Sequence, residues 1–366
     1  MKIVYFIDHL RPDGTQFVLK QLVEGLSARG HQQFVICLND SWDAELKRKL
    51  EGFNAEVRII GKPALLSGLG WLSILKILNI HKFDVAVTLL LYSDVIGRTL
   101  GHITGIPRIV SSIQTRDEFY KKWQRWIVRY TARWADVILL NSRYVRDFAI
   151  REEGASKEKI VVIPNSICVE DYLHPLGHDD LRKSLNIPKG STLIGMVARL
   201  IHQKGQDILL KAFANISNFQ MHLLLVGVGE TESKLRKLAF TLGIEERVLF
   251  LGYRRDVQKL IGALDLYVQP SRYEGMPIVV LEAMAAGCPV IASAVDGNQE
   301  LIQDGVDGWL VPPEDHIALA KAICEAIENK SEAQRRAKAA QKRVSEQFGV
   351  DKMVLAWEAV LQGKPL

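Results

Sequence analysis

Two glutamates spaced eight residues apart are the first candidates for chemistry in this sequence. Glu274 and Glu282 lie in the segment RYEGMPIVVLEAMAAGCPVIAS, residues 272–293. A carboxylate can accept two hydroxyl hydrogen bonds, such as those that a sugar or a ribose diol offers. The alternative is a surface cap and an exposed helix residue, which an isolated pair of glutamates would favour. The loop and helix around this pair favour ligand binding instead.

The segment around the glutamates carries the signals of a strand, a turn and a helix. We expect a strand at Leu266–Gln269, a turn at 270–275 and a helix with Pro277 in its first position. Glu274 then lies on the loop and Glu282 lies inside the helix. The amides at the helix start, with the positive end of the helix dipole, suit a phosphate. These amides belong to Met276, Ile278 and Val279.

Two cations lie on a second predicted loop. In GMVARLIHQKGQD, residues 195–207, we expect a strand to end at Ala198 and a helix to begin near Gln206. Arg199 and Lys204 therefore follow the carboxyl end of a strand, where two fixed cations can neutralise a diphosphate. If they contact a leaving group, their hold strengthens as negative charge develops in the transition state. Two solvated loop cations are the alternative.

A third candidate loop lies near the beginning of the sequence. The segment RPDGTQFVLKQLVEGLSARGH, residues 11–31, follows a strand that we expect to end near Asp8. Gly14 permits close approach of the backbone to a ligand. Thr15 is expected to be the N-cap of a helix that extends to Arg29. An ordinary turn between a strand and a helix is the alternative.

Two further signals are weaker. The turn VGVGE, residues 226–230, contains G-x-G but lacks the third glycine of a dinucleotide fingerprint, which disfavours a dehydrogenase. We expect Gly227 and Gly229 to shape a turn at the end of a strand. His9 is a candidate for the acceptor side of a site, and a structural role is the alternative.

Short apolar runs alternate with helical patterns along the whole chain. This alternation predicts an α/β protein with two Rossmann-like domains, each a parallel sheet covered by helices. The first series of strands is expected at Lys2–Ile7, Gln33–Leu38, Val85–Leu91, Arg108–Ile113, Val137–Asn141 and Ile160–Ile163. The second is expected at Thr192–Ala198, His222–Gly227, Arg247–Phe250, Leu266–Gln269, Pro289–Ser293 and Gly308–Val311. Ligands of such sheets bind at the carboxyl ends of the strands, so two facing sheets would give an interdomain cleft.

The bulk composition bounds the class of protein. The chain has 366 residues, of which 48% are hydrophobic and 24% charged, as expected for a globular protein with a large core. No run reaches the roughly 18 apolar residues of a membrane span, and MKIVYFIDHL is typical of a buried strand, not of a signal peptide. The four cysteines form no C-x-x-C pair, which fits a reducing cytosol.

Charge is spread unevenly along the chain. Residues 1–165 hold 24 Lys and Arg against 17 Asp and Glu, a balance of +7, whereas the remainder has a balance of −2. The first half is therefore expected to meet an anionic partner. Nucleic acid is disfavoured, because no compact recognition motif accompanies the charge.

One basic helix within that half combines cations with aromatic side chains. In FYKKWQRWIVRYTARW, residues 119–134, the aromatic residues share one face of a helix and Lys or Arg recurs at i, i+4 spacing on another. This is the pattern of a helix lying at an anionic membrane surface. The alternative is an amphipathic helix whose aromatic face packs on its own domain. The aromatic face contains Trp123, Trp126, Tyr130 and Trp134, with Ile127 among them.

The motifs together resemble those of the retaining, two-domain transferases called family 4 glycosyltransferases, which have the GT-B architecture. The resemblance covers nearly the whole chain and is densest from 194 to 312. It rests on ARLIHQKGQD, VGVGE, FLGYRRDV, YVQPSRYEGMPIVVLEAMAAGCPVIAS and DGNQELIQDGVDGWLVPP. The eight-residue spacing of Glu274 and Glu282 within this context is highly specific.

The resemblance implies a division of labour. Residues 1–165, completed by a C-terminal helix at about 350–366 around Trp357, would bind the acceptor, and residues 166–349 would bind a nucleotide sugar. Glu274, Arg199 and Lys204 would act in catalysis. Glu274 would contact the donor sugar, Glu282 the ribose, and the two cations the diphosphate. The other donor-binding residues would be Gly14, Tyr253, Arg254, Gly275, Met276, Pro277 and Ile278.

The sequence departs from that family at three places. The first loop has Asp13 and Gly14 where relatives often have paired glycines, and the usual P-N-G turn has serine as its third residue. Where many relatives carry a histidine, this sequence has Gln114 or Thr115, which makes Gln114 a candidate on the acceptor side. This last difference affects any donor or acceptor assignment that depends on the histidine.

The implied reaction transfers a glycosyl group, with retained anomeric configuration, from a nucleoside diphosphate sugar to a hydroxyl. A UDP-sugar is the favoured donor, and GDP-mannose is the second choice. No cofactor or metal ion is expected. The acceptor is expected to be a lipid-linked or cell-surface glycan, and the protein to be cytoplasmic, on the inner face of the membrane. The alternatives are a catalytically silent sugar-nucleotide-binding subunit and a glycoside hydrolase that uses the two glutamates.

Overall fold

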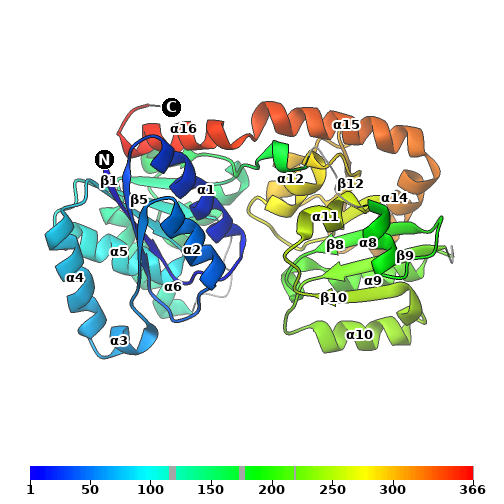
Figure 1. Ribbon diagram of the computed structural model, residues 1–366, viewed down its shortest axis with the longest axis horizontal. Helices are drawn as coiled ribbons and strands as arrows, with labels where there is room; N and C mark the ends of the chain where they lie inside the picture. The colour runs from blue at the N-terminus through cyan, green and yellow to red at the C-terminus, as the bar shows by residue number, and fades with distance from the viewer. Residues whose placement is uncertain (115–120, 173–177, 218–219, 366) are drawn as a thin grey trace. The chain divides into compact units, whose positions relative to one another are not determined.

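The computed structural model describes residues 1–114, 121–172, 178–217 and 220–365, and its chain forms two compact units. Unit 1 comprises Met1–Asn165 together with Val350–Leu366, and unit 2 comprises Ser166–Gly349. Each is a parallel sheet between helices (Figure 1). The two Rossmann-like domains expected from the alternation of apolar runs are therefore confirmed.

Unit 1 is built on a seven-stranded parallel sheet with the order β3-β2-β1-β4-β5-β6-β7. Its strands are β1 (Lys2–Ile7), β2 (Gln32–Cys37), β3 (Ala55–Ile59), β4 (Val85–Leu89), β5 (Arg108–Ile113), β6 (Val137–Leu140) and β7 (Ile160–Val162). Its helices are α1 (Gly14–Ala28), α2 (Ala44–Gly52), α3 (Lys62–Leu66), α4 (Leu69–His81), α5 (Leu91–Ile103), α6 (Lys122–Thr131), α7 (Arg146–Glu153) and α16 (Val350–Leu361). The strand order reverses between β1 and β4, which is where such sheets bind ligands.

Unit 2 repeats this plan with a six-stranded parallel sheet in the order β10-β9-β8-β11-β12-β13. Its strands are β8 (Thr192–Val197), β9 (Met221–Val226), β10 (Val248–Gly252), β11 (Leu266–Gln269), β12 (Val290–Ser293) and β13 (Trp309–Val311). Its helices are α8 (His178–Ser184), α9 (Gln206–Ala214), α10 (Glu232–Thr241), α11 (Val257–Gly262), α12 (Ile278–Ala285), α13 (Asp296–Leu301), α14 (His316–Glu328) and α15 (Lys330–Gln347). Here the order reverses between β8 and β11.

The central strands form because they are almost wholly apolar. β1 and β2 bury every residue after their first, and such continuous burial is typical of strands covered by helices on both faces. Strand β3 was not predicted from the sequence. It lies at the edge of the sheet, where Glu56 and Arg58 alternate with buried Ala55 and Val57, so its apolar signal is short.

The helix α16 belongs to unit 1 although it follows the whole of unit 2 in sequence. It packs against α1, and the two helices lie side by side in Figure 1. Trp357 is 1% exposed, and Glu358 forms ion pairs with Arg29 at 2.6 Å and with His31 at 2.7 Å. The approach is close at Gly25, where an added Cβ would lie 2.6 Å from a methyl group of Val354.

Two predicted helix starts need correction. Thr15 is not an N-cap, because α1 begins at Gly14 and Asp13 is the capping residue, whose carboxylate accepts the Gly14 N–H. An acidic side chain suits this place, since it lies at the positive end of the helix dipole. Pro277 is the N-cap of α12 and not its first helical residue, because its ψ of 115° is extended.

Candidate active site

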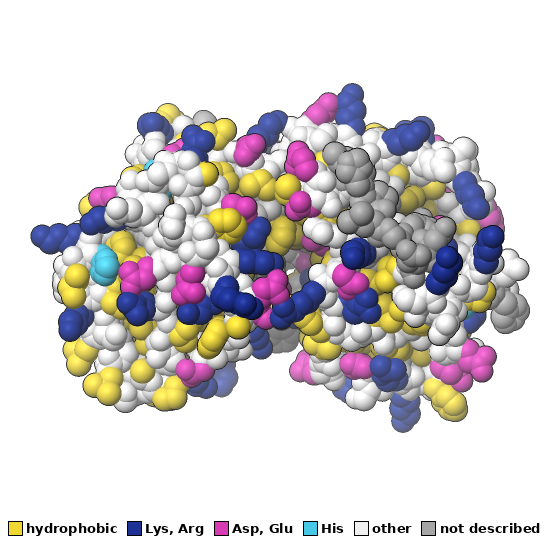
Figure 2. Space-filling model, viewed as in Figure 1, with side chains coloured by type: hydrophobic (Ala, Val, Ile, Leu, Met, Phe, Trp, Pro, Cys, Tyr) yellow, Lys and Arg dark blue, Asp and Glu magenta, His cyan; other side chains and the backbone are white. Residues whose placement is uncertain are grey.

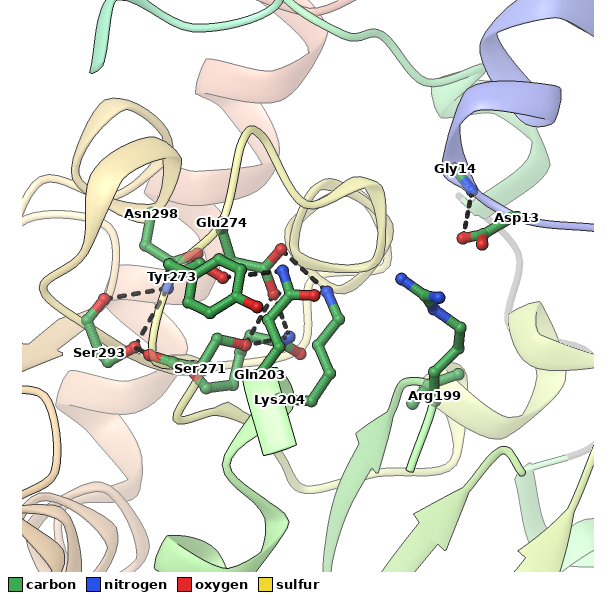
Figure 3. Close-up of polar contacts among 12 residues, drawn as sticks. Asp13, Gly14, Arg199, Gln203, Lys204, Ser271, Tyr273, Glu274, Ser293 and Asn298 are labelled. Atoms are coloured by element: carbon green, nitrogen blue, oxygen red, sulfur yellow. Dashed lines mark hydrogen bonds and ion pairs between the residues drawn. The ribbon is translucent and has the colours of Figure 1, made fainter. Parts of the chain in front are cut away.

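Two loop segments of unit 2 lie at the carboxyl ends of β8 and β11, where the strand order reverses. Arg199 and Lys204 lie on the segment between β8 and α9, and Glu274 lies on the segment between β11 and α12. Figure 3 shows Arg199 and Lys204 extending to the same side of the loop that carries them. These residues come together because neighbouring parallel strands end at the same edge of a sheet.

The strongest direct contact in this region joins Lys204 to Glu274. The Lys204 Nζ atom donates to both carboxylate oxygens of Glu274, at 2.6 and 2.9 Å. The Lys204 side chain is 16% exposed and that of Glu274 is 5% exposed. The pair is therefore shielded from water, and its electrostatic interaction is stronger than that of a surface ion pair. The alternative hypothesis, in which Glu274 is a surface capping residue, is therefore wrong.

Two residues that sequence patterns did not single out complete the surroundings of Glu274. Its Oε1 atom accepts from the Ser271 hydroxyl at 2.7 Å and from the Gln269 side-chain amide at 3.0 Å. Gln269 in turn accepts from the Tyr267 hydroxyl at 2.6 Å. Polar side chains on the last residue of a buried strand and just beyond it were the signal that could have identified them. The carboxylate is thus held in one orientation by neutral donors as well as by the ammonium.

Glu282 occupies a separate place on α12, in the interior of the helix. It is 9% exposed, and its Oε1 atom accepts from the Tyr172 hydroxyl at 2.7 Å. Burial raises the pKa of Glu282 to about 7, although the Tyr172 hydrogen bond opposes the rise. Tyr172 ends the short helix at Val169–Tyr172, and sequence patterns gave no sign of its role.

The two glutamates share a neighbour, the buried Tyr267 on β11. Burial raises the pKa of the Tyr267 hydroxyl well above its ordinary value, and the charges of Glu282 and then Glu274 raise it further. Both carboxylates therefore lie close enough to one ring to influence it electrostatically. The eight-residue spacing places one of them on the loop and the other on the helix, around the end of the same strand.

Glycines bring the surrounding backbones into contact. An added Cβ at Gly227 would lie 2.0 Å from the Ala198 carbonyl oxygen, and one at Gly229 would lie 2.1 Å from that of Leu200. The VGVGE turn therefore packs directly on the two residues that flank Arg199. Similarly, an added Cβ at Gly297 would lie 1.7 Å from the Gly275 carbonyl oxygen, so α13 supports the loop that carries Glu274.

The start of α12 is the place where the sequence predicts phosphate binding. Gly275, Met276 and Pro277 approach the helix, which begins at Ile278, and its first amides have no carbonyl one turn earlier within the helix. Tyr253 and Arg254 follow β10. Tyr253 is 51% exposed, and Arg254 forms two hydrogen bonds to the carboxylate of Asp256, at 2.8 and 2.6 Å.

The remaining candidates belong to unit 1. Gly14 is the first residue of α1 and donates its N–H to Asp13 at 2.9 Å (Figure 3). His9 follows β1, and its carbonyl oxygen and Nδ1 atom contact the Gln16 side-chain amide at 2.8 and 3.1 Å.

Gln114 lies at the carboxyl end of β5. It donates to Ser112 at 2.6 Å, and its backbone and side-chain oxygens accept from Asn141 at 2.7 and 3.2 Å. The alternative position for the missing histidine, Thr115, lies outside the described residues. In the described part of the chain, no cluster of three or more His, Cys, Asp or Glu side chains has the arrangement of a metal site.

Comparisons with known proteins agree with the fold. Residues 12–171 match a family model described as Glycosyltransferase Family 4, and residues 178–343 match one described as Glycosyl transferases group 1. HepE from Anabaena, crystallised with UDP and glucose and also with UDP-glucose, superposes with a TM-score of 0.88. It is 26% identical in sequence, and the match covers 99% of this chain and 100% of that one.

Curated relatives point the same way. The Escherichia coli enzyme named UDP-Gal:alpha-D-GlcNAc-diphosphoundecaprenol alpha-1,3-galactosyltransferase is 26% identical over 85% of this chain and 87% of its own length. An uncharacterised glycosyltransferase of Methanocaldococcus jannaschii is 29% identical over 80% of each chain. The fold and these matches together define a glycosyltransferase of the GT-B architecture. Within that class, the chain belongs to the family 4 glycosyltransferases.

Proposed function

We propose that this protein transfers a glycosyl group from a UDP-sugar to the hydroxyl of a lipid-linked or cell-surface glycan, with retention of the anomeric configuration. The observation that carries the proposal is the shielded Lys204–Glu274 pair at the point where the strand order of unit 2 reverses. The pair combines a cation for phosphate with a carboxylate for sugar hydroxyls. It is held by neighbouring side chains before any ligand arrives.

The donor binds to unit 2 in this proposal. Arg199 and Lys204 neutralise the diphosphate, and the Gly275–Ile278 backbone at the start of α12 adds amide donors to it. Glu274 accepts hydrogen bonds from the hydroxyls of the sugar, and Glu282 accepts those of the ribose. Tyr253 and Arg254 lie beside the base, and Gly14 is a further donor-binding residue in this proposal.

The reaction takes place on one face of the sugar. The bond from C1 to the β-phosphate oxygen breaks, and a bond from C1 to the acceptor oxygen forms on the same face. The leaving diphosphate takes the proton of the acceptor hydroxyl, so the products are UDP and the glycoside and no side-chain base is needed. Arg199 and Lys204 stabilise the charge that develops on the diphosphate. Because these cations supply the positive charge, the proposal includes no metal ion or cofactor.

The choice of donor and acceptor is supported by the relatives. The Anabaena neighbour holds UDP and UDP-glucose, and the name of the Escherichia coli relative gives a UDP-sugar as donor and a diphosphoundecaprenol-linked sugar as acceptor. Unit 1, with His9 and Gln114 at the ends of its strands, binds the acceptor in this proposal. A polyprenol-linked acceptor stays in the bilayer, so peripheral contact with the inner face of a membrane belongs to the same proposal.

Calorimetric titration of the full chain tests the donor half of the proposal. We expect UDP to bind, GDP and ADP to bind more weakly, and Arg199→Ala to weaken UDP binding at least tenfold, since a charge-assisted hydrogen bond contributes about 1.5–3 kcal/mol. Arg335→Ala, an exposed cation of α15, is the matched control. Absence of nucleoside diphosphate binding would overturn the proposal.

Turnover distinguishes an enzyme from a silent binding subunit. With UDP-sugars and a panel of polyprenol-diphosphate sugars, we expect release of UDP in the presence of EDTA. NMR of the product should show the anomeric configuration of the donor. UDP binding without transfer to any acceptor would support the silent subunit, and loss of activity in EDTA would refute a metal-independent reaction.

A further inference from the structure

Exposed apolar side chains gather on one part of unit 1. Of the seventeen large apolar side chains exposed among the described residues, nine lie between residues 66 and 130. They are Leu66, Leu69, Leu72, Ile80, Tyr92, Ile103, Trp123, Trp126 and Tyr130. They belong to α3–α6 or adjoin these helices. Isolated exposed apolar residues need no explanation, but a concentration of this kind marks an interaction surface.

Helix α4 shows the feature most clearly. Ile74 and Leu78 are buried in the core of unit 1, whereas Leu69, Leu72 and Ile80 are 67%, 64% and 63% exposed. The exposed residues follow one stripe at i, i+3 and i+11, with the exposed Lys76 between them. The core of unit 1 therefore accounts for only one side of this helix. Its other side is apolar without a partner in the described structure.

The exposed apolar side chains of helix α6 are aromatic, whereas those of α4 are aliphatic. Trp123 and Trp126 are 58% and 66% exposed, and Trp126 stacks on the half-exposed Tyr130 with ring centroids 5.4 Å apart. The alternative, in which the aromatic face packs on its own domain, therefore does not hold for these three rings. Phe119 and Tyr120, the first residues of that predicted helix, lie outside the described residues.

These helices cover the same face of the sheet. Residues of α4 and α5 pack in one cluster with Ile109 of β5. Ile113 lies four residues after Ile109 on β5, so its side chain points to the same face of the sheet. It packs in one cluster with Ala132, the residue that follows α6. A hydrogen bond from Gln124 of α6 to Tyr92 of α5, at 3.3 Å, joins the exposed residues of these two helices.

The outward side of these helices carries the exposed apolar side chains described above. Apolar side chains appear at the left of Figure 2, where Figure 1 places α3 and α4. We define the α3–α6 face as the exposed side chains within residues 62–133 on these four helices and on the described residues that directly flank them.

The positive charge of the N-terminal half is concentrated in the same stretch. Residues 62–133 contain eleven Lys and Arg against four Asp and Glu, a balance of +7, whereas the rest of residues 1–165 is balanced with thirteen of each. The exposed cations of the face include Lys62, Lys76, Lys82, Lys121, Lys122, Arg129 and Arg133. The apolar surface and the charge excess therefore occur together.

We infer that the α3–α6 face docks on the surface of an anionic lipid bilayer, which assigns to particular residues the membrane contact included in the proposed function. Leucines of α3 and α4 and the rings of α6 enter the boundary between headgroups and acyl chains, while the lysines reach the lipid phosphates. Each basic residue near an anionic surface adds attraction, and the long lysine stem lets Lys76 lie beside leucines. Among the described residues, no helix is long and apolar enough to cross a bilayer, so this contact is peripheral.

Flotation of the full chain with vesicles tests the inference without any nucleotide or acceptor. We expect binding to phosphatidylcholine–phosphatidylglycerol vesicles, at least tenfold weaker binding to phosphatidylcholine alone, and marked loss of binding in 0.5 M salt. The double variants L69Q/L72Q, W123A/W126A and K76E/K122E should each weaken binding to the anionic vesicles at least tenfold. F240Q, which changes a 70% exposed residue of α10 in unit 2, is the matched control and should bind like the wild type.

Several outcomes would overturn the inference. These are failure of the wild type to bind anionic vesicles at low salt, or unchanged binding by folded W123A/W126A and K76E/K122E proteins. A wild-type dimer that these variants convert to monomers, without an effect on vesicle binding, would assign the face to a second copy of the chain. Circular dichroism verifies the fold of each variant. Because flotation needs no donor, failure of the proposed transfer reaction would leave this result unaffected.

Discussion

Replacing Glu282 with glutamine should change how the stability of unit 2 depends on pH. Burial raises the pKa of Glu282 from 4.5 to about 7 in the folded protein. A carboxyl with a raised pKa binds more protons folded than unfolded, so its contribution to stability is present below its unfolded pKa and is lost as pH rises through its folded pKa. For these two pKa values, the loss between pH 5 and pH 8 is about 2.5 kcal/mol.

Scanning calorimetry of the ligand-free full chain at the two pH values measures this effect. Glutamine stays neutral at both pH values and keeps an oxygen for the Tyr172 hydroxyl. The Tm of unit 2 in Glu282→Gln, measured relative to the wild type at the same pH, should therefore be about 5–10 °C higher at pH 8 than at pH 5. Other titrating groups cancel in this comparison. Glu245→Gln, at an exposed carboxyl of the same unit, should show no such gain. Equal pH dependence of wild type and Glu282→Gln would refute the burial argument.

Two further predictions concern the supports of the site. Lys204→Met should lower the free energy of unfolding by about 3 kcal/mol, because the Glu274 carboxylate stays buried without its cation, and adding Glu274→Gln should recover at least about 1 kcal/mol of it. A double-mutant cycle in urea with a coupling below about 0.5 kcal/mol would contradict this. Gly297→Ala should displace the Gly275 carbonyl and weaken UDP binding at least tenfold by calorimetric titration, whereas Gly52→Ala, in open space on unit 1, should leave UDP binding unchanged.

The parts of the fold that the sequence predicts are those where local pattern and tertiary environment agree. β1, β5 and β11 were predicted to the residue, because each contains a short run of mainly β-branched, aliphatic or aromatic residues that is also buried in the sheet. β3 was missed because only one of its faces is buried, and its exposed charged residues break the apolar run.

The candidate site was predictable at its charged residues and not at their partners. The spacing of Glu274 and Glu282 and the order of Arg199 and Lys204 lie within single segments, so they can be read locally. Tyr172 contacts Glu282 across 110 residues of sequence, and nothing in its own segment indicates that contact. The exposure of the apolar residues on α4 and α6 could not be predicted from local pattern either. An apolar stripe has the same spacing whether that side of the helix faces the core or the solvent.

The return of α16 to unit 1 has a consequence for how the chain is made. Residues 350–361 leave the ribosome only after all of unit 2 has been synthesised, yet they supply Trp357 and the partner of Arg29 and His31. Until then the side of α1 that α16 covers, including Gly25, lacks its neighbour. Unit 1 therefore lacks one of its helices until the whole of unit 2 has been synthesised, although most of unit 1 is made first.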